Sequence, residues 1–314
     1  MNINSVFSTT ASIMYLAFSI GMVVSFPVMA QLSTSNLLLH DFVTGQTRQI
    51  TDTKGYTNQP YFTQDSQTLR YTEQVIALER IEMTATEGAR ITAGEGTQMD
   101  IFAYHIKQAQ HQNLTQSAWS EYSATPYLNG FSAIAVDANN AQWLYAFSTD
   151  GMRKEPLIPQ EPIGYHAWLD EQHLAVFILG DTPAPHSLQI VALNSTEVEI
   201  VDVNIGASIY SGPADTVLYS QKLSGEKQHR VLSFDRRTSQ IMYLGNLPEG
   251  SDYFYYANGK MLVANKTKVL KAEFIGGHAL HWETLLDLSK ACDGQLTRLA
   301  QAPNERYLAV VCQG

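Results

Sequence analysis

Basic residues are scarce in this sequence, and they nowhere form a run. Lys and Arg total 20 against 30 Asp and Glu, which gives a formal net charge of −10 over 314 residues. Nucleic acids and anionic membrane surfaces both attract proteins through clustered Lys and Arg. We therefore expect neither as a partner. Hydrophobic residues make up 45% of the chain, which suffices for the core of one large domain or two ordinary ones.

Recognisable catalytic motifs are also missing. The sequence has no Gly-x-Ser-x-Gly elbow and no glycine-rich loop of the phosphate-binding kind. His278 and His281 have only Glu283 and Asp287 nearby as further ligands, which favours an exposed hairpin over a metal site. Some aspartates could pair across a channel, although Asp at a strand end more often caps a turn: Asp100, Asp137, Asp181, Asp202 and Asp215. We predict no catalytic residue, no metal and no other cofactor.

Cysteine occurs only twice, as Cys292 and Cys312. In an exported protein an even number of cysteines favours a disulfide, and closing a loop of this length would stabilise the fold by about 3 kcal/mol. The alternative is two buried free thiols. A zinc site would need a different spacing and a nearby His pair. We predict the disulfide.

The first thirty residues contain no charged side chain. The segment 11–30 is mostly apolar and ends in Val28-Met29-Ala30, with small residues at the positions that an export peptidase reads. We predict a signal peptide, residues 1–30, and a periplasmic or secreted mature chain without a membrane span. The alternative is an uncleaved anchor, because about 20 apolar residues can cross a bilayer and no Lys or Arg precedes the run. No Cys follows the run, which excludes a lipid anchor on cysteine.

The remaining chain repeats one unit of four short strands. An apolar step before a tight turn recurs with gaps of 66, 42, 44, 43 and 47 residues, at Pro60, Pro126, Trp168, Gly212, Tyr255 and Ala302. Asn-Gly, a strong hairpin signal, supplies two of the turns. The long first gap contains a polar insertion, 75–99, which we expect to leave the channel face as a flap. A four-stranded sheet cannot bury its faces alone, but a ring of such sheets can.

The repeats predict an all-β fold, a six-bladed β-propeller of four-stranded antiparallel blades over residues 31–314. The mature chain opens with a third and a fourth strand, at 37–42 and 47–51. It closes with a first strand and a second strand, the latter at 307–311. We therefore expect strands from both ends of the chain to share one blade and close the ring.

Three stretches resemble the TolB-like (WD40-like) propeller repeat. The best is LLLHDFVTGQTRQIT (37–51) followed by NQPYFTQDSQTLRYT (58–72), then LTRLAQAPNERYLAVV (296–311) and TPYLNGFSAIAV (125–136). The middle blades, 142–220, match only in strand order and spacing, and the full Ser-Pro-Asp-Gly-like turn of the family is absent. The resemblance implies an exported propeller that works as a binding module with other envelope proteins.

A tyrosine stands just before the expected first strand in five of the six blades. Five such rings could form an aromatic rim at the channel mouth, because Tyr is large, rigid and amphipathic. Packing between blades is the alternative role. Two neighbours join this candidate binding set, whose members are Tyr56, Asn58, Tyr122, Tyr165, His166, Tyr210 and Tyr253.

The sequence thus predicts a monomeric, non-catalytic module that binds an envelope protein or a peptide. Two alternatives stay open. One is a propeller hydrolase or lactonase, which would need carboxylates converging on the channel. The other is a small-molecule sensor with a deep channel pocket.

Overall fold

The computed structural model describes residues 33–78, 82–84, 88–90, 93–181, 183–273 and 280–314, and side chains are described outside 77–96. The predicted signal peptide and His278 lie outside these residues. Within them, no helix is long and apolar enough to cross a membrane.

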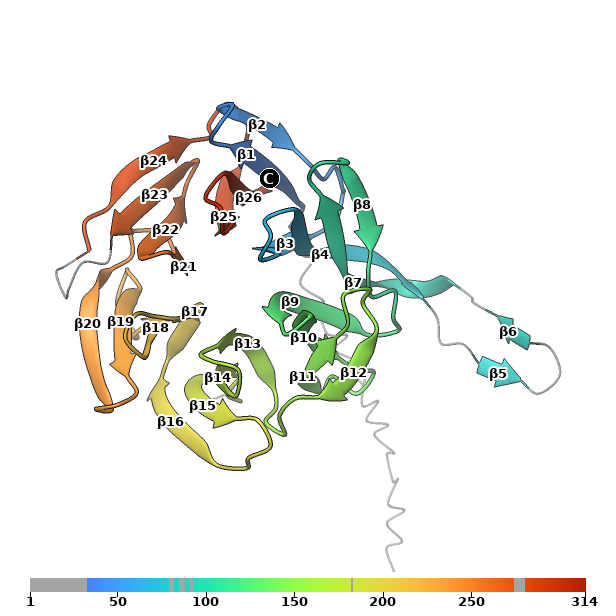
Figure 1. Ribbon diagram of the computed structural model, residues 1–314, viewed down its shortest axis with the longest axis horizontal. Coiled ribbons are helices and arrows are strands. Elements are labelled where there is room, and N and C mark those ends of the chain that lie inside the picture. Colours follow the sequence, from blue (N-terminus) through green and yellow to red (C-terminus); the bar gives the residue numbers. More distant parts are fainter. Residues whose placement is uncertain (1–32, 79–81, 85–87, 91–92, 182, 274–279) are drawn as a thin grey trace, which may run out of the picture. The chain divides into compact units, whose positions relative to one another are not determined.

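The described strands form six four-stranded antiparallel sheets and one two-stranded hairpin (Figure 1). Each sheet is a blade, named here by its innermost strand. From the innermost strand outward, the first blade has β25 (Gln295–Gln301), β26 (Tyr307–Gln313), β1 (Ser35–Asp41) and β2 (Gln46–Gln49), and the next has β3 (Thr57–Phe62), β4 (Thr68–Leu78), β7 (Ala93–His105) and β8 (Gln110–Asn113). The third blade has β9 (Ser120–Tyr127), β10 (Gly130–Val136), β11 (Gln142–Phe147) and β12 (Arg153–Pro156), and the fourth has β13 (Ile163–Trp168), β14 (His173–Ile178), β15 (Ser187–Ala192) and β16 (Val198–Val203). The fifth blade has β17 (Ile205–Ser211), β18 (Thr216–Gln221), β19 (Arg230–Asp235) and β20 (Gln240–Asn246), and the sixth has β21 (Tyr255–Ala257), β22 (Lys260–Asn265), β23 (Lys268–Glu273) and β24 (Glu283–Asp287).

The six blades follow one another around a central axis, with their innermost strands facing it (Figure 1). Contacts between β25 and β3, and between β22 and β25, seat the β25 blade between the first and last of the other five. In a ring of six, the β13 blade is therefore opposite the β25 blade. The prediction of a six-bladed propeller is confirmed.

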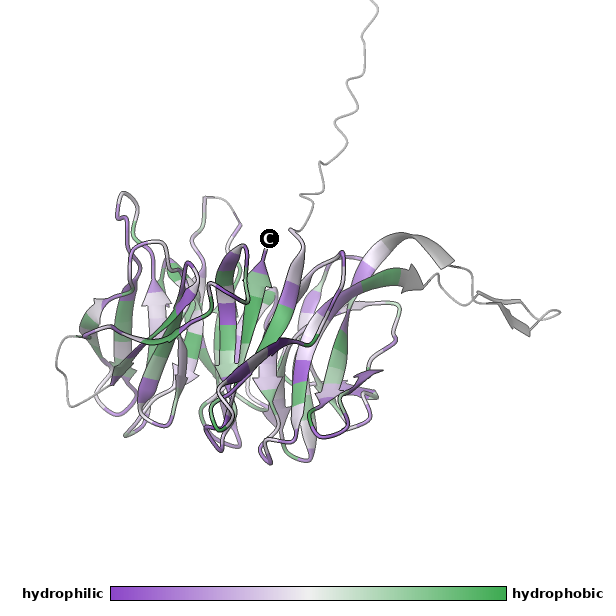
Figure 2. Cartoon of the chain, turned by 90° about the horizontal axis from the view of Figure 1, so that it is seen from above, coloured by the Kyte–Doolittle hydropathy of each residue, from purple (hydrophilic) through white to green (hydrophobic). Residues whose placement is uncertain are grey.

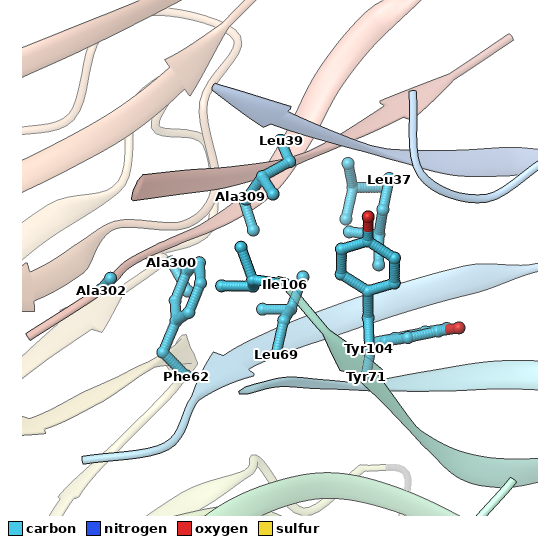
Figure 3. Packing of buried hydrophobic residues seen from close by; sticks show 11 residues of the cluster. Leu37, Leu39, Phe62, Leu69, Tyr71, Tyr104, Ile106, Ala300, Ala302 and Ala309 are labelled. Carbon is cyan, nitrogen blue, oxygen red and sulfur yellow. The ribbon is translucent and has the colours of Figure 1, made fainter. Parts of the chain in front are cut away.

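The core lies between the blades. Middle strands are apolar on both faces because each face meets a neighbouring blade, and each of the six junctions holds one buried cluster. At the junction of the β25 and β3 blades, Leu37, Leu39 and Ala309 face Phe62 and Leu69 (Figure 3). Figure 2 shows hydrophobic residues along the strands and many hydrophilic residues in the loops that join them. Packing between sheets, as repeat architectures require, therefore holds the ring together.

Strands from both ends of the chain close the ring, as predicted. β1 pairs with β26 over seven residues, from Ser35↔Gln313 to Asp41↔Tyr307. The predicted Cys292–Cys312 disulfide is confirmed, with 5.7 Å between the two Cα atoms. Arg306 adds an ion pair with Asp41 across the same sheet, at 2.8 Å.

The two Asn-Gly hairpins differ in register. Asn258 and Gly259 are the two residues between β21 and β22, both with positive φ, as a tight hairpin turn requires. At the other site the two connecting residues are Leu128 and Asn129, and Gly130 already pairs with Tyr127. A Cβ on Gly130 would lie 2.0 Å from the Phe147 carbonyl oxygen, so this glycine is needed for close backbone approach.

The insertion at 75–99 is built largely from strands. β4 and β7 remain paired past the blade as far as Leu78↔Ala93, with register Ile76↔Thr97 before that. A short hairpin, β5 (Glu82–Thr84) and β6 (Gly88–Arg90), follows between them. Figure 1 draws this hairpin outside the ring and away from the axis. The flap expected at the channel face is not seen in the described residues, because continued pairing of β4 and β7 carries both strands outward.

Candidate functional site

The predicted tyrosines all lie on or next to the innermost strands, but not all before them. Tyr56 directly precedes β3, and Tyr253 lies two residues before β21. Tyr122, Tyr165 and Tyr210 lie inside β9, β13 and β17. Their expected place before the strand is wrong, because these strands begin several residues earlier than the apolar step used to locate them. Of these three, Tyr165 and Tyr210 belong to the channel wall in the described residues, and Tyr122 packs at a blade junction.

A cavity of about 270 Å³ occupies the centre of the ring. All six innermost strands contribute to its lining, from Gln59–Tyr61 of β3 to Arg298 of β25. Four of the seven predicted site residues line it, namely Tyr165, His166, Tyr210 and Tyr253. Tyr56, Asn58 and Tyr122 are not among the described lining residues. The structure thus brings four of the seven residues together at one cavity, and their role in binding stays a prediction.

The hydroxyls of Tyr56, Tyr210 and Tyr253 stay protonated at neutral pH. Burial raises the pKa of Tyr56 to about 12 and raises the pKa of Tyr210 and Tyr253 as well. The hydroxyls of Tyr210 and Tyr253 share a hydrogen bond across two neighbouring blades. The Tyr210 ring also packs on Phe254, with centroids 5.6 Å apart. These side chains combine inter-blade packing with hydroxyls that can donate.

Packing explains three of the five predicted tyrosines in part. Tyr122 packs on the cluster between the β9 and β13 blades, Tyr165 on the next cluster and Tyr210 on the one after it. The alternative role that the sequence left open is therefore present in the fold. It does not fill the cavity, which remains open between the strands that carry these rings.

Arg298 is the residue that sequence reasoning missed. It lies in the middle of β25, and its side chain is only 16% exposed. Its Nη1 donates to Oδ1 of Asp252 at 3.2 Å, and its Cζ lies 4.4 Å from the centre of the Tyr253 ring. Burial lowers the pKa of Arg298, but Tyr165 on the opposite blade, Asp252 and Tyr253 outweigh this and raise it overall. The guanidinium therefore stays charged within the channel.

A positional signal could have found Arg298. It stands four residues before Ala302, the same offset that separates Tyr56 from Pro60 and Tyr122 from Pro126. The β25 blade is the one without a tyrosine at this place. Arg298 takes the sixth position of the tyrosine set, and it is the one charged residue in the first strand β25.

His166 lines the same cavity as a neutral ring. It is 8% exposed, and burial lowers its pKa to about 3. Its Nε2 lies 2.7 Å from Oγ of Ser132, which also accepts a hydrogen bond from Nε1 of Trp168 at 2.9 Å. Its Nδ1 is buried without a partner among the described residues. Ser132 is fully buried, so the Ser–His pair joins two blades and offers no exposed nucleophile.

The aspartates named from the sequence do not line the cavity in the described residues. Asp137 caps a turn by accepting from the backbone N–H of Asn139 at 2.8 Å. Asp100 accepts from Gln98 and Asn113, Asp202 accepts from Tyr219 and Gln221, Asp215 pairs with Arg236, and Asp181 is exposed. No group of three His, Cys, Asp or Glu side chains suited to a metal is found within the described residues.

Glu121, next to Tyr122, is a fully buried carboxyl group. Its Oε1 accepts from Oγ of Ser117 and lies 4.0 Å from Arg153, while its Oε2 has no partner in the described part of the chain. Burial, with a smaller contribution from Asp100, raises its pKa to about 7 against the opposing effects of Ser117, Thr115 and Arg153. The carboxyl group is therefore partly protonated near neutral pH in the folded state.

Replacing Glu121 with Gln is expected to flatten the dependence of stability on pH. Between pH 4.5 and about 7 the folded wild type binds more protons at this group than the unfolded chain. Its free energy of unfolding therefore falls as pH rises through this window, by roughly 2–3 kcal/mol for a pKa difference of this size. Glu121→Gln removes this loss.

Urea unfolding at pH 5 and pH 8 measures the effect. Glu121→Gln should gain stability relative to wild type at pH 8 and match it near pH 5. Glu171→Gln, an exposed turn substitution, serves as the control and should keep the wild-type profile. An unchanged slope in Glu121→Gln would contradict the assignment. Glu73, whose pKa burial also raises to about 7, contributes equally to both proteins.

Comparisons with known proteins place the fold. No protein-family model and no curated protein matches the chain. Among solved structures, a putative TolB from Agrobacterium tumefaciens superposes with a TM-score of 0.63 at 10% identity, over 90% of this chain and 99% of that one. TolB from Acinetobacter baumannii superposes with a TM-score of 0.53 at 12% identity, over 90% of this chain and 64% of that one. An oligogalacturonate lyase in complex with manganese superposes with a TM-score of 0.52 at 11% identity, over 89% of this chain and 83% of that one. The fold is that of TolB-like propellers, and enzymes share it.

Proposed function

We propose that this protein is an exported, non-catalytic binding module that takes a peptide segment of an envelope protein into its central channel. The cavity at the ring axis carries the proposal, because all six blades contribute to it and its wall is aromatic and polar. Small cavities lined by aromatic side chains with a few polar groups are typical of binding sites. A volume of about 270 Å³ suits a side chain or a chain end, not a folded domain.

Export is part of the proposal. A disulfide persists in oxidising compartments, and Cys292–Cys312 ties the segment before β25 to β26 in the ring-closing blade. The apolar segment that ends at Ala30 supplies a signal for secretion. Both features fit a periplasmic or secreted protein that meets its partner outside the cytoplasm.

The enzyme alternative rests on the shared fold with a lyase. A metal-dependent reaction in the channel would need carboxylate or imidazole ligands that converge on the axis. The only charged side chain among the described lining residues is a cation, Arg298. This chemistry favours recognition of an acidic or polar group over metal binding.

Blocking the cavity tests the proposal. Ala207 lines the cavity on β17, and Ala207→Trp would fill it while leaving the tyrosines in place. Ala184→Trp makes the same change at an exposed loop and serves as the matched control. Residues 31–314 of each protein are immobilised and exposed to the exported fraction, and any retained protein is purified and its affinity measured.

A partner that binds the wild type and Ala184→Trp, and binds Ala207→Trp at least about tenfold more weakly, supports the channel as the site. Equal binding to all three would contradict it. Retention of no protein by any of them would also contradict the proposal, and metal analysis with small-molecule screening would then follow.

A further inference from the structure

The central cavity carries one fixed positive charge in a chain whose net charge is −10. Arg298 contributes it, and no carboxylate side chain is found among the described lining residues. His166 is neutral, and Tyr210 and Tyr253 are protonated. A ligand that enters the cavity therefore meets a cation surrounded by neutral donors.

The surroundings hold Arg298 in place. Its guanidinium lies over the Tyr253 ring at 4.4 Å, a distance at which a cation and an aromatic face attract each other. Asp252 accepts one hydrogen bond from Nη1, and Tyr165 approaches from the opposite blade. The arginine thus reaches across the axis from one side of the ring toward the other. A side chain held in this way loses little further freedom when a ligand binds.

Arg298 also keeps donors to spare. A guanidinium carries five N–H donors, and in the described residues its side-chain partners are the Asp252 carboxylate and the Tyr165 hydroxyl, which leaves further N–H groups for a ligand. The Asp252 carboxylate is 66% exposed, so solvent screens its charge, whereas the Arg298 side chain is 16% exposed. Planar guanidinium groups bind carboxylates through paired hydrogen bonds, which are stronger than neutral ones.

We propose that Arg298 anchors a carboxylate of the inserted peptide, with hydroxyls of the tyrosines that line the cavity as further donors. This inference rests on the proposed function and names the group that the channel recognises. The carboxylate is either the free C-terminus of the peptide or an Asp or Glu side chain, and the cavity volume admits either.

Three pools of N-acetylated tetrapeptides test the proposal. The first has free C-terminal carboxylates and no acidic residue, the second has C-terminal amides with one Asp or Glu, and the third has amides without an acidic residue. Each pool is incubated with residues 31–314, and retained peptides are identified and their affinities measured. Arg298→Met is compared with Arg306→Met as a control. Arg306→Met also removes a cation, but from the turn between β25 and β26, where Arg306 pairs with Asp41.

We expect retention from the first or second pool and not from the third, with binding weakened at least about tenfold in Arg298→Met and unchanged in Arg306→Met. The pool that binds identifies the source of the carboxylate. Peptides retained equally from all pools, or equally by Arg298→Met, would overturn the inference while leaving a peptide-binding channel in place. Retention of no peptide would overturn the inference, and the Ala207→Trp capture would judge the function separately. If Arg298→Met does not fold, the comparison between pools on the wild type still decides.

Discussion

Replacing Leu38 with proline is expected to lower the free energy of unfolding by at least about 4 kcal/mol. Leu38 lies in the middle of β1, is 2% exposed and pairs with Val310 of β26 and Gln49 of β2. Proline removes a ladder hydrogen bond inside the sheet, and loss of the buried leucine leaves a cavity. Because the pairing of β1 with β26 closes the ring of blades, the substitution weakens the contact on which ring closure depends. A loss of this size is a large share of the stability of an ordinary domain.

The same substitution in the outer strand of that blade is the control. The backbone N–H of Ile50 donates to the Leu37 carbonyl at 2.8 Å, so the alternating N–H of Gln49 faces solvent. Proline is tolerated on an edge strand in that position. We expect Gln49→Pro to cost no more than about 1 kcal/mol in urea unfolding. Similar losses in both variants would show that the β1–β26 pairing does not control closure.

Phe131→Ala is expected to cost about 3–5 kcal/mol, the second-largest effect. Phe131 is fully buried between the β3 and β9 blades, and its ring stacks on Phe147 with centroids 5.0 Å apart. The guanidinium of Arg70 lies 4.7 Å from the same ring, so truncation also removes a cation–π contact. Arg70 is itself buried, so truncation of Phe131 leaves a buried charge without its aromatic contact.

Leu128→Ala, three residues earlier in the hairpin, is the matched control. Leu128 is 77% exposed, and its truncation should change stability by no more than about 0.5 kcal/mol. Urea unfolding of both variants gives the comparison. A loss below about 1 kcal/mol for Phe131→Ala would mean that the junction between the β3 and β9 blades contributes little to the ring.

The fold could be predicted because its determinants are local and repeated. Short apolar strands and tight turns recur at a nearly constant spacing, and the residues of each segment predict its secondary structure without reference to the rest of the chain. The disulfide was predicted from the cysteine count and the expected export of the chain. The insertion was harder, because its polar composition concealed the continued pairing of β4 and β7 out to Leu78↔Ala93. Pairing depends on the partner strand, which composition does not report.

The site was only partly predictable for a related reason. A tyrosine set could be recognised by recurrence, but whether Tyr122 faces the cavity or a blade junction depends on where β9 begins. Arg298 was missed because its role comes from Tyr165 and Tyr253, which belong to other blades and come close only when the ring closes. The spacing of Arg298 matches that of Tyr56 and Tyr122, but spacing alone does not report which side chains meet across the axis.

The shared blade makes the folded chain almost a closed circle. The backbone N–H of Gly314 donates to the Thr34 carbonyl at 3.2 Å, so a short linker could join these residues without moving a strand. The packing of the six blades therefore does not depend on where along this circle the backbone is interrupted. A circularly permuted chain opened in the connection Pro159–Glu161, where Pro159 and Glu161 are exposed between β12 and β13, would build the same ring from a different starting blade.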